Sequence, residues 1–401
     1  MPRAPTSVAI DPEALVTPDD TTLLDAGVTL ALVIGPDGDQ IEAVTVALDV
    51  VRRDVPDQQA VLARSYPTHT PLALTRVPVS ELGSLAGLRL RLKVDGEPRQ
   101  DGSIADLVAP PDVLVASIAR RVRLQAGDIV LVGTPPGTAF DRGGGWLRPG
   151  SELVATVDGV AQLRTHVGEP GGRPPRPPAA ARGNRVFVTG TNSRSHLDEM
   201  GGGAAPEFPT ANLLKLPDAV CGTDVDIVLP SDTFVDYEGE LAVVIGVPTH
   251  HVTVDQVDDV VMGVCLANDV TARDAPTTHL ALAKNGARFC PLGPVVAVSS
   301  TGLDDLSFTV RVNGELRQCG HSRDMIHSIR DVVASYSAGL PLEPGDVILT
   351  GSPAGVGVAR RPPVFLQHGD TVEIESPQLG RLANRFVSST PPRRNARSER
   401  S

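Results

Sequence analysis

Two glutamates separated by one glycine stand where the chain enters an apolar segment. Glu238 and Glu240 flank Gly239, and residues 241–245 are apolar and rich in β-branched side chains, which is typical of a buried strand. Side chains two positions apart in a strand point to the same face, so the two carboxylates are expected to lie side by side. Carboxylates held this close repel each other unless a cation or a proton lies between them. The spacing indicates a cation site, and an exposed acidic strand end is the simpler alternative.

A third carboxylate follows the next apolar segment. Asp269 comes directly after the apolar run 260–267 and its following asparagine, so a second buried strand would deliver it to the same place as Glu238 and Glu240. Three carboxylates favour Mg²⁺ or Mn²⁺ over zinc, which prefers His and Cys ligands. Such an ion keeps positions open for a chelating 2-oxo acid and acts as a Lewis acid while an enolate develops. We therefore predict a metal site formed by Glu238, Glu240 and Asp269.

A histidine and a glutamate form a second candidate pair. His196 and Glu199 are three residues apart on a short predicted helix that Asn192 or Ser193 can cap, so they share one face. A carboxylate beside an imidazole orients the ring and raises its basicity, which activation of a water molecule requires. A solvated surface pair is the alternative interpretation.

Four motifs occur in a fixed order in the second half of the chain. They are Glu-x-Glu at 238–240, Asn-Asp-x-x-x-Arg-Asp at 268–274, a lysine loop at 283–294, and Gly-Asp-x-Ile-x-Thr-Gly-Ser-Pro at 345–353. In combination they resemble the fumarylacetoacetate hydrolase family over residues 186–387. The resemblance implies a mainly β fold, a divalent metal ion and a small 2-oxo acid as substrate.

The same resemblance implies roles for individual side chains. The segment 192–199 resembles a family element that forms a lid over the substrate, and Lys215 occupies the lysine position of the family's Phe-x-Lys-Pro segment. Lys284 matches the family's catalytic lysine, placed to stabilise an enolate oxygen or to transfer a proton. The predicted catalytic residues are His196, Glu199 and Lys284, and the predicted substrate-binding residues are Arg273, Thr350 and Lys215.

Segments of the first half recur in the second at nearly one spacing. Residues 49–56 match 269–276 at a shift of 220 (269 − 49), and residues 127–137 match 345–355 at a shift of 218 (345 − 127). Similarity at a nearly constant spacing indicates a tandem duplication. The first half has Gly27 and Thr29 where the second has its two glutamates, and Arg64 in place of the catalytic lysine. We expect the first half to be a structural copy without metal, and a separate metal-free activity is the alternative.

Many short strands with little helix indicate a mainly β (α+β) fold, with one β-roll in each half. Residues 1–22 are expected to form a loose lead-in, and one amphipathic helix is predicted over 322–338. The proline- and glycine-rich segment 168–184 is predicted to be a linker between a degenerate half at 1–167 and a catalytic half at 185–388. The tail 389–401 is predicted to be disordered.

Composition excludes several classes of function. The net charge of the 401 residues is −12 and no basic run interrupts the folded regions, which argues against nucleic-acid binding. No apolar segment reaches the length of a membrane span or signal peptide. The four cysteines lack Cys-x-x-Cys spacing and are expected to be reduced. We therefore expect a cytoplasmic protein without membrane or nucleic-acid partners. The duplication favours a pseudo-dimer of halves, or a homo-oligomer.

The duplicated architecture narrows the expected function. A degenerate copy fused to a complete one resembles the form of the family that acts in homoprotocatechuate degradation. That form decarboxylates 5-oxopent-3-ene-1,2,5-tricarboxylate and isomerises the product. The first hypothesis is therefore a Mg²⁺- or Mn²⁺-dependent decarboxylase/isomerase of unsaturated 2-oxo carboxylates. One alternative is a hydrolase that cleaves the C–C bond of an acylpyruvate-like β-diketone, and another is a metal-binding scaffold without turnover or recruited for biosynthesis.

Overall fold

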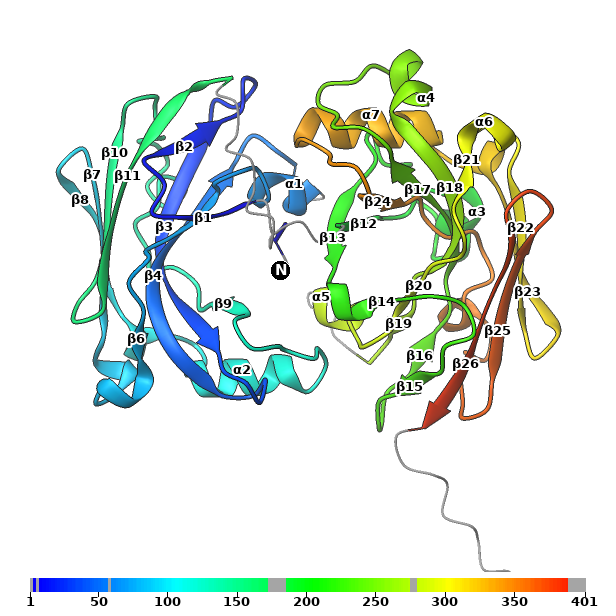
Figure 1. Cartoon of the computed structure of the whole chain (residues 1–401), viewed down its shortest axis with the longest axis horizontal. Helices are drawn as coiled ribbons and strands as arrows, with labels where there is room; N and C mark the ends of the chain where they lie inside the picture. The colour runs from blue at the N-terminus through cyan, green and yellow to red at the C-terminus, as the bar shows by residue number, and fades with distance from the viewer. Residues whose placement is uncertain (1–2, 5–6, 57–58, 172–184, 275–279, 389–401) are drawn as a thin grey trace, which may run out of the picture.

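Two halves of similar construction lie side by side in the computed structural model, which describes residues 3–4, 7–56, 59–171, 185–274 and 280–388 (Figure 1). Most of the predicted linker (172–184) and the predicted tail (389–401) fall outside the described residues. Within the described residues, no helix is long and apolar enough to cross a membrane. The structure confirms the mainly β fold and its repetition in two halves.

The first half consists of two sheets with short helices at their edges. One sheet has the order β1 (Val8–Ile10), β5 (Thr70–Leu72), β4 (Ile41–Arg52), β3 (Leu24–Ile34) and β9 (Ile129–Leu131), with β6 (Val77–Pro78) beside β4. The other has the order β2 (Ala14–Thr17), β11 (Ala161–Pro170), β10 (Glu152–Val157), β7 (Arg89–Val94) and β8 (Glu97–Ser103). The α-helices are α1 (Ala60–Arg64) and α2 (Pro111–Ala119).

The second half repeats this construction. Its inner sheet has the order β13 (Ala211–Lys215), β12 (Val186–Thr189), β24 (Val347–Leu349), β17 (Gly239–Ile245), β18 (Val261–Asn268) and β21 (Val296–Ala297). Its outer sheet has the order β15 (Ile227–Leu229), β26 (Gly380–Ser388), β25 (Thr371–Ser376), β22 (Ser307–Val312) and β23 (Glu315–His321). Two short pairs complete the strands: β14 (Val220–Cys221) with β20 (Cys290–Pro291), and β16 (Val235–Asp236) with β19 (Thr271–Ala272). The α-helices are α3 (Arg194–Glu199), α4 (Val257–Val260), α5 (Leu280–Ala283), α6 (Val298–Thr301) and α7 (Ile329–Gly339).

The strand β17 is buried on both faces, which explains its continuous apolar sequence. Leu241, Val243 and Ile245 pack into the large core between the sheets, whereas Ala242 and Val244 belong to a smaller cluster on the opposite face. A strand covered on both sides has no solvated face and therefore shows no polar alternation. Since β17 can neither slide nor rotate without exposing one of these faces, it holds the residues at its amino-terminal end in a defined register.

Hydrogen bonds from backbone N–H groups to side chains recur at equivalent positions of the two halves. The Asp25 carboxylate accepts a hydrogen bond from the backbone N–H of Ala139 at 2.8 Å, and Asp236 accepts one from Gly357 at 2.7 Å. The equivalent glutamines of the two halves also make the same hydrogen bond. Gln100 Oε1 accepts from the backbone N–H of Val28, and Gln318 Oε1 accepts from that of Gly239. The tandem duplication is therefore retained in the tertiary contacts as well as in the sequence.

Two local predictions are wrong. Residues 1–22 contain the strands β1 and β2, which pair with β5 and β11 and bury Leu15 completely, because each fills an edge of a sheet. The helix predicted over 322–338 begins only at Ile329, after a capping box formed by Ser328 and Asp331. Residues 322–324 form a separate 3-10 helix, and between it and α7 the backbone N–H of Ile326 donates to the backbone oxygen of Asn192 at 2.9 Å.

Candidate metal centre and active site

Three carboxylates meet at the junction of β17 and β18. Glu238 immediately precedes β17, Glu240 lies within it, and Asp269 follows β18, which pairs antiparallel to β17. One carboxylate oxygen from each residue lies within 4.8 Å of the others, and all three residues are buried. The residue between the glutamates must be glycine, because a Cβ on Gly239 would lie 2.3 Å from Val310 Cγ2.

Three cations surround these carboxylates. The Lys284 ammonium lies 2.7 Å from Glu238 Oε2 and also contacts Asp269. The Arg273 guanidinium contacts Glu238 and Asp236. Lys215 lies 2.6 Å from Asp269 Oδ1. The structure thus brings together the predicted metal ligands and three of the predicted catalytic and substrate-binding cations.

The two glutamates differ in their electrostatic surroundings. Burial by itself would raise the pKa of Glu238, but Lys284 and Arg273 outweigh this effect and hold the pKa at about 2. Burial and the neighbouring carboxylate of Asp269 raise the pKa of Glu240 well above its usual value. Its Oε2 accepts one hydrogen bond, from the backbone N–H of Gly351 at 2.7 Å. Among the described residues, no cation forms an ion pair with Glu240.

This donor set fits a divalent ion. Hard oxygen ligands suit Mg²⁺ and Mn²⁺, and Glu240 is a buried acid whose negative charge has no ion-pair partner in the described part of the chain. Glu238, Glu240 and Asp269 would hold the ion, as predicted. The chemistry and burial of the triad therefore suit a divalent-metal centre.

Lys215 and Thr350 lie deeper than the prediction of substrate contact suggests. The Lys215 ammonium is completely buried and also donates to the backbone oxygens of Phe289 and Lys284. The Thr350 hydroxyl donates to the backbone oxygen of Leu241 at 2.9 Å. Both polar groups are therefore used within the protein, where Lys215 supports a metal ligand and Thr350 supports β17. Their contact with substrate stays a prediction.

The predicted His-Glu pair is formed, and it is anchored to the site. His196 Nδ1 lies 2.7 Å from Glu199 Oε1, while Glu199 Oε2 accepts from the backbone N–H of Gly355 at 2.9 Å. His196 is close enough to Glu238 to contribute to the lowered pKa of that carboxyl. Ser195 Oγ accepts from the N–H of Ala354, so α3 docks on the loop that follows β24. The pair therefore belongs to the same site as the triad.

Comparison with known proteins identifies the family. Residues 2–168 and 185–387 match the family described as fumarylacetoacetate (FAA) hydrolase C-terminal. The chain belongs to this family. An oxaloacetate tautomerase of Bacillus subtilis, YisK, is 36% identical over 247 residues, which make up 60% of this chain and 78% of that protein.

Solved structures of the fumarylacetoacetate hydrolase family match about half of the chain. A 5-carboxymethyl-2-hydroxymuconate delta-isomerase from Mycobacterium smegmatis is 37% identical, with 51% of this chain and 76% of that chain covered and a TM-score of 0.45. A fumarylpyruvate hydrolase from Pseudomonas aeruginosa, in complex with Mn²⁺ and pyruvate, is 28% identical, with 51% and 90% covered and a TM-score of 0.47.

The first half of this family member has an aspartate paired with cations, as the second half does, but it has Gly27 and Thr29 at the positions of Glu238 and Glu240. Asp49, the equivalent of Asp269, is bound by Arg64 and Arg3 at 2.5 Å each. A Cβ on Gly27 would lie 2.3 Å from Thr134 Oγ1, so a glutamate does not fit where the second half has Glu238. Within the described residues, the triad of the second half is the only such acidic group.

Arg3 takes the structural place of Lys215, which the sequence comparison missed. Arg3 donates to the backbone oxygen of His69 and contacts Asp49, as Lys215 does with Phe289 and Asp269. The two segments share no recognisable motif, and only the paired contacts reveal the equivalence. Asp236 was missed as a functional residue too, although its counterpart Asp25 binds Arg53 as Asp236 binds Arg273. The internal repeat was the signal that could have found it.

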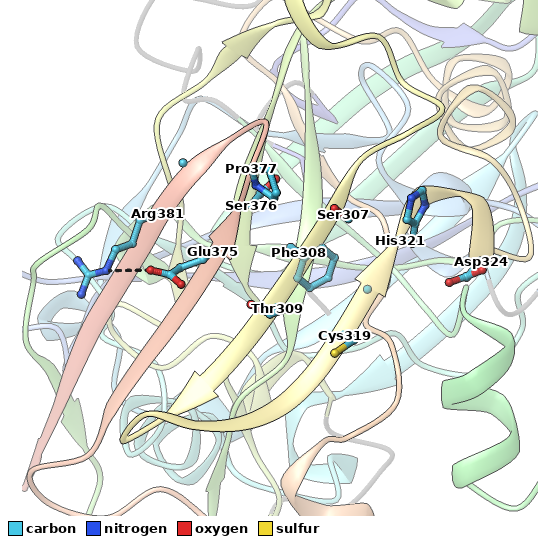
Figure 2. Close-up of a pocket in the computed structure, with 12 residues that line it drawn as sticks. Ser307, Phe308, Thr309, Cys319, His321, Asp324, Glu375, Ser376, Pro377 and Arg381 are labelled. Atoms are coloured by element: carbon cyan, nitrogen blue, oxygen red, sulfur yellow. Dashed lines mark ion pairs between the residues drawn. The ribbon is translucent and has the colours of Figure 1, made fainter.

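A large pocket of about 760 Å³ lies elsewhere, on the outer sheet of the second half (Figure 2). Figure 2 shows Cys319 and His321 along β23, and Glu375 and Arg381 on the neighbouring hairpin. None of the predicted site residues lines this pocket. It is separate from the metal centre, which is buried in the inner sheet.

Proposed function

We propose that the protein is a divalent-metal-dependent enzyme that decarboxylates or isomerises a small unsaturated 2-oxo acid with two or three carboxylates, such as 5-oxopent-3-ene-1,2,5-tricarboxylate. The observation that carries the proposal is the buried triad in direct contact with Lys284 and Arg273. Carboxylates and cations in one water-poor site can bind a polyanionic substrate and compensate the charge that moves during reaction.

A divalent ion held by Glu238, Glu240 and Asp269 would supply Lewis acidity toward the keto oxygen of the substrate. The side chains around it have separate tasks. Arg273 is held by Asp236 and keeps 19% of its side-chain surface exposed, which suits it to bind a substrate carboxylate. Lys284 offers an ammonium next to the triad, where it can donate a hydrogen bond or a proton to an enolate oxygen. Helix α3 is docked on the loop after β24 through Ser195 and Glu199, which places His196 for proton transfer at the site.

The name of one relative supports an enol–keto proton shift. The Bacillus subtilis relative is an oxaloacetate tautomerase, and tautomerisation moves a proton between an enol oxygen and the neighbouring carbon of a 2-oxo dicarboxylate. Decarboxylation and isomerisation of a vinylogous 2-oxo acid pass through the same kind of enolate. One arrangement of cations around the keto oxygen therefore serves each of these reactions.

Hydrolysis of a C–C bond is a second candidate, favoured by the His196–Glu199 contact of 2.7 Å. Glu199 is fixed at both oxygens, by His196 and by the Gly355 N–H, so it orients the imidazole. An imidazole oriented in this way can take a proton from water and direct the water at a carbonyl carbon. A β-diketone such as an acylpyruvate would be the substrate class.

The decisive experiment measures CO₂ release from 5-oxopent-3-ene-1,2,5-tricarboxylate with Mg²⁺ or Mn²⁺ and then with excess EDTA. Parallel assays follow enol-to-keto conversion of oxaloacetate and cleavage of an acylpyruvate. CO₂ release that requires metal supports the proposal. Absence of release from a folded, metal-loaded protein that cleaves the acylpyruvate would replace it by the hydrolase. A metal-loaded protein inactive in all three assays would instead be a binding scaffold.

A further inference from the structure

An ion pair ties the first half to the catalytic segment of the second. Arg121 follows α2, and its Nη2 lies 2.9 Å from Oδ2 of Asp274, which follows β19. Figure 1 shows the end of α2 reaching toward the second half below α5. Both side chains are partly shielded, with 31% and 22% of their surfaces exposed. Partial shielding strengthens an ion pair relative to one on the open surface.

Asp274 lies on the opposite side of a segment that carries catalytic groups. The Thr271 hydroxyl accepts a hydrogen bond from the Lys284 ammonium at 2.9 Å, and Arg273 binds Glu238. Ala272 and Asp274 instead line a pocket of about 370 Å³ between the halves. Successive side chains of an extended segment point to opposite sides, so Thr271 and Arg273 face the site while Ala272 and Asp274 face the pocket. Any displacement of Asp274 therefore moves the backbone that aims Arg273 at the metal ligand.

The equivalent place on the other side of the molecule is closed by apolar packing. There α1 of the first half rests on the end of α7, and a Cβ on Gly339 would lie 2.5 Å from Leu62 Cδ1. In the duplication, Arg121 corresponds to Gly339, and Leu282 corresponds to Leu62. On the catalytic side, Arg121 and Leu282 both line the open pocket. An open pocket lies beside the segment here, and the Arg121–Asp274 ion pair connects the segment directly to the first half.

We propose that Arg121 is a positioning residue for the reaction of the second half, supplied by the half that lacks metal ligands. By holding Asp274, it keeps Arg273 in contact with Glu238 and so preserves both the geometry of the metal ligand and the carboxylate-binding guanidinium. The effect on turnover depends on the function proposed above, whereas the effect on the metal ligand does not. The degenerate half thereby contributes to catalysis without binding metal.

The test compares Arg121→Gln with Arg123→Gln in the full-length protein. Arg123 also faces the second half, where its Nε lies 3.8 Å from Asp218, but it does not line the pocket. We expect Arg121→Gln to weaken Mn²⁺ binding, measured by calorimetry, and to lower kcat/KM, each by about fivefold. Arg123→Gln should change neither quantity. A charge exchange, Arg121→Asp with Asp274→Arg, should restore most of both.

The outcomes separate this inference from the proposed function. Weaker Mn²⁺ binding in Arg121→Gln, reversed in the exchanged pair, supports the positioning role even if no assayed substrate turns over. Unchanged Mn²⁺ affinity in a folded Arg121→Gln protein overturns it, and so does an equal loss in Arg123→Gln. Failure of the exchanged pair to recover, while circular dichroism shows the native fold, also overturns it.

Discussion

At the scale of single residues, the buried carboxylates of the site are paired with cations of the described residues, except for the carboxylate of Glu240. Asp236, Glu238 and Asp269 each contact a lysine or arginine, whereas Glu240 accepts a backbone N–H from Gly351 and forms no ion pair with any described residue. Burial and the neighbouring carboxylate of Asp269 raise the pKa of the Glu240 carboxyl, so a cation beside it would relieve an unfavourable charge. Glu240 is therefore the ligand whose loss should matter most for metal binding.

We expect Glu240→Ala to abolish metal binding and turnover together, with Mn²⁺ affinity reduced by about 100-fold or more. Calorimetric titration with Mn²⁺ measures the first effect, and the enol–keto assay measures the second. The fold should survive, because the substitution removes a buried acid that no cation of the described residues pairs with. Full activity of the variant without added metal would contradict the metal mechanism.

His69 in the first half carries a separate, pH-dependent effect on stability. Burial and the neighbouring Arg52 lower the pKa of His69 to about 3. Between pH 6.5 and about 3 the unfolded chain binds a proton that the folded protein excludes, so stability falls as the pH falls. The contribution of this histidine to that slope is at most about 1.4 kcal/mol per pH unit.

We predict that His69→Leu flattens the decline of the unfolding midpoint between pH 6.5 and 4, because leucine has no group to protonate. Urea denaturation at several pH values measures the slope. The exposed His166 is the matched control, and His166→Leu should leave the slope unchanged. Parallel slopes in the wild type and His69→Leu would show that other groups dominate.

At the scale of elements, α3 is too short to be stable by itself and is held by side-chain contacts. Asn192 ahead of it donates to the backbone oxygens of Thr350 and His327, and Glu199 at its end accepts from Gly355. These contacts therefore keep the helix docked on the loop that follows β24. Glu199 serves both the docking of the helix and the orientation of His196.

We expect Glu199→Ala to impair C–C hydrolysis by about 100-fold and tautomerisation far less, because only hydrolysis requires an activated water. Rates of acylpyruvate cleavage and of oxaloacetate tautomerisation measure the two effects. Asp198→Ala, on the exposed side of the same helix, is the control and should change neither rate. Equal losses in both reactions would refute the role in water activation.

At the scale of the whole molecule, the two halves have a similar arrangement of strands and differ in the acidic residues at the equivalent site. The cations of the second half have counterparts in the first, where arginines contact both Asp25 and Asp49. The two glutamates have none, and Thr134 occupies the space beside Gly27. In the first half, guanidinium groups thus neutralise the aspartates Asp25 and Asp49.

We therefore predict one bound divalent ion per chain. Asp269→Asn should abolish binding, whereas Asp49→Asn at the duplicated position should leave the stoichiometry and the affinity unchanged. Metal analysis of the purified proteins and calorimetry with Mn²⁺ provide the measurement. Two ions in the wild-type chain, or loss of binding in Asp49→Asn, would show that the first half is a metal site.

Much of the candidate site was predictable because its signals are local in sequence. Glu238 and Glu240 are brought together by the alternation of one strand, and Asp269 follows a strand whose apolar character is visible in the chain. His196 and Glu199 meet because three residues make nearly one helical turn. The boundary of α7 was missed because residues 322–324 form a separate 3-10 helix and Asn192, which lies far away in the sequence, binds Ile326 between that helix and α7.

The sequence by itself determined the family, the mainly β class, the duplication and the acidic triad, since each depends on short patterns that recur or alternate. Only the tertiary structure decided that Lys215 supports Asp269 from beneath, that Arg3 does the same for Asp49, and that Arg121 reaches the catalytic half. These contacts join groups far apart in the chain. Burial and charge neutralisation between distant segments have no periodicity, so they become visible only when the strands and loops are in place.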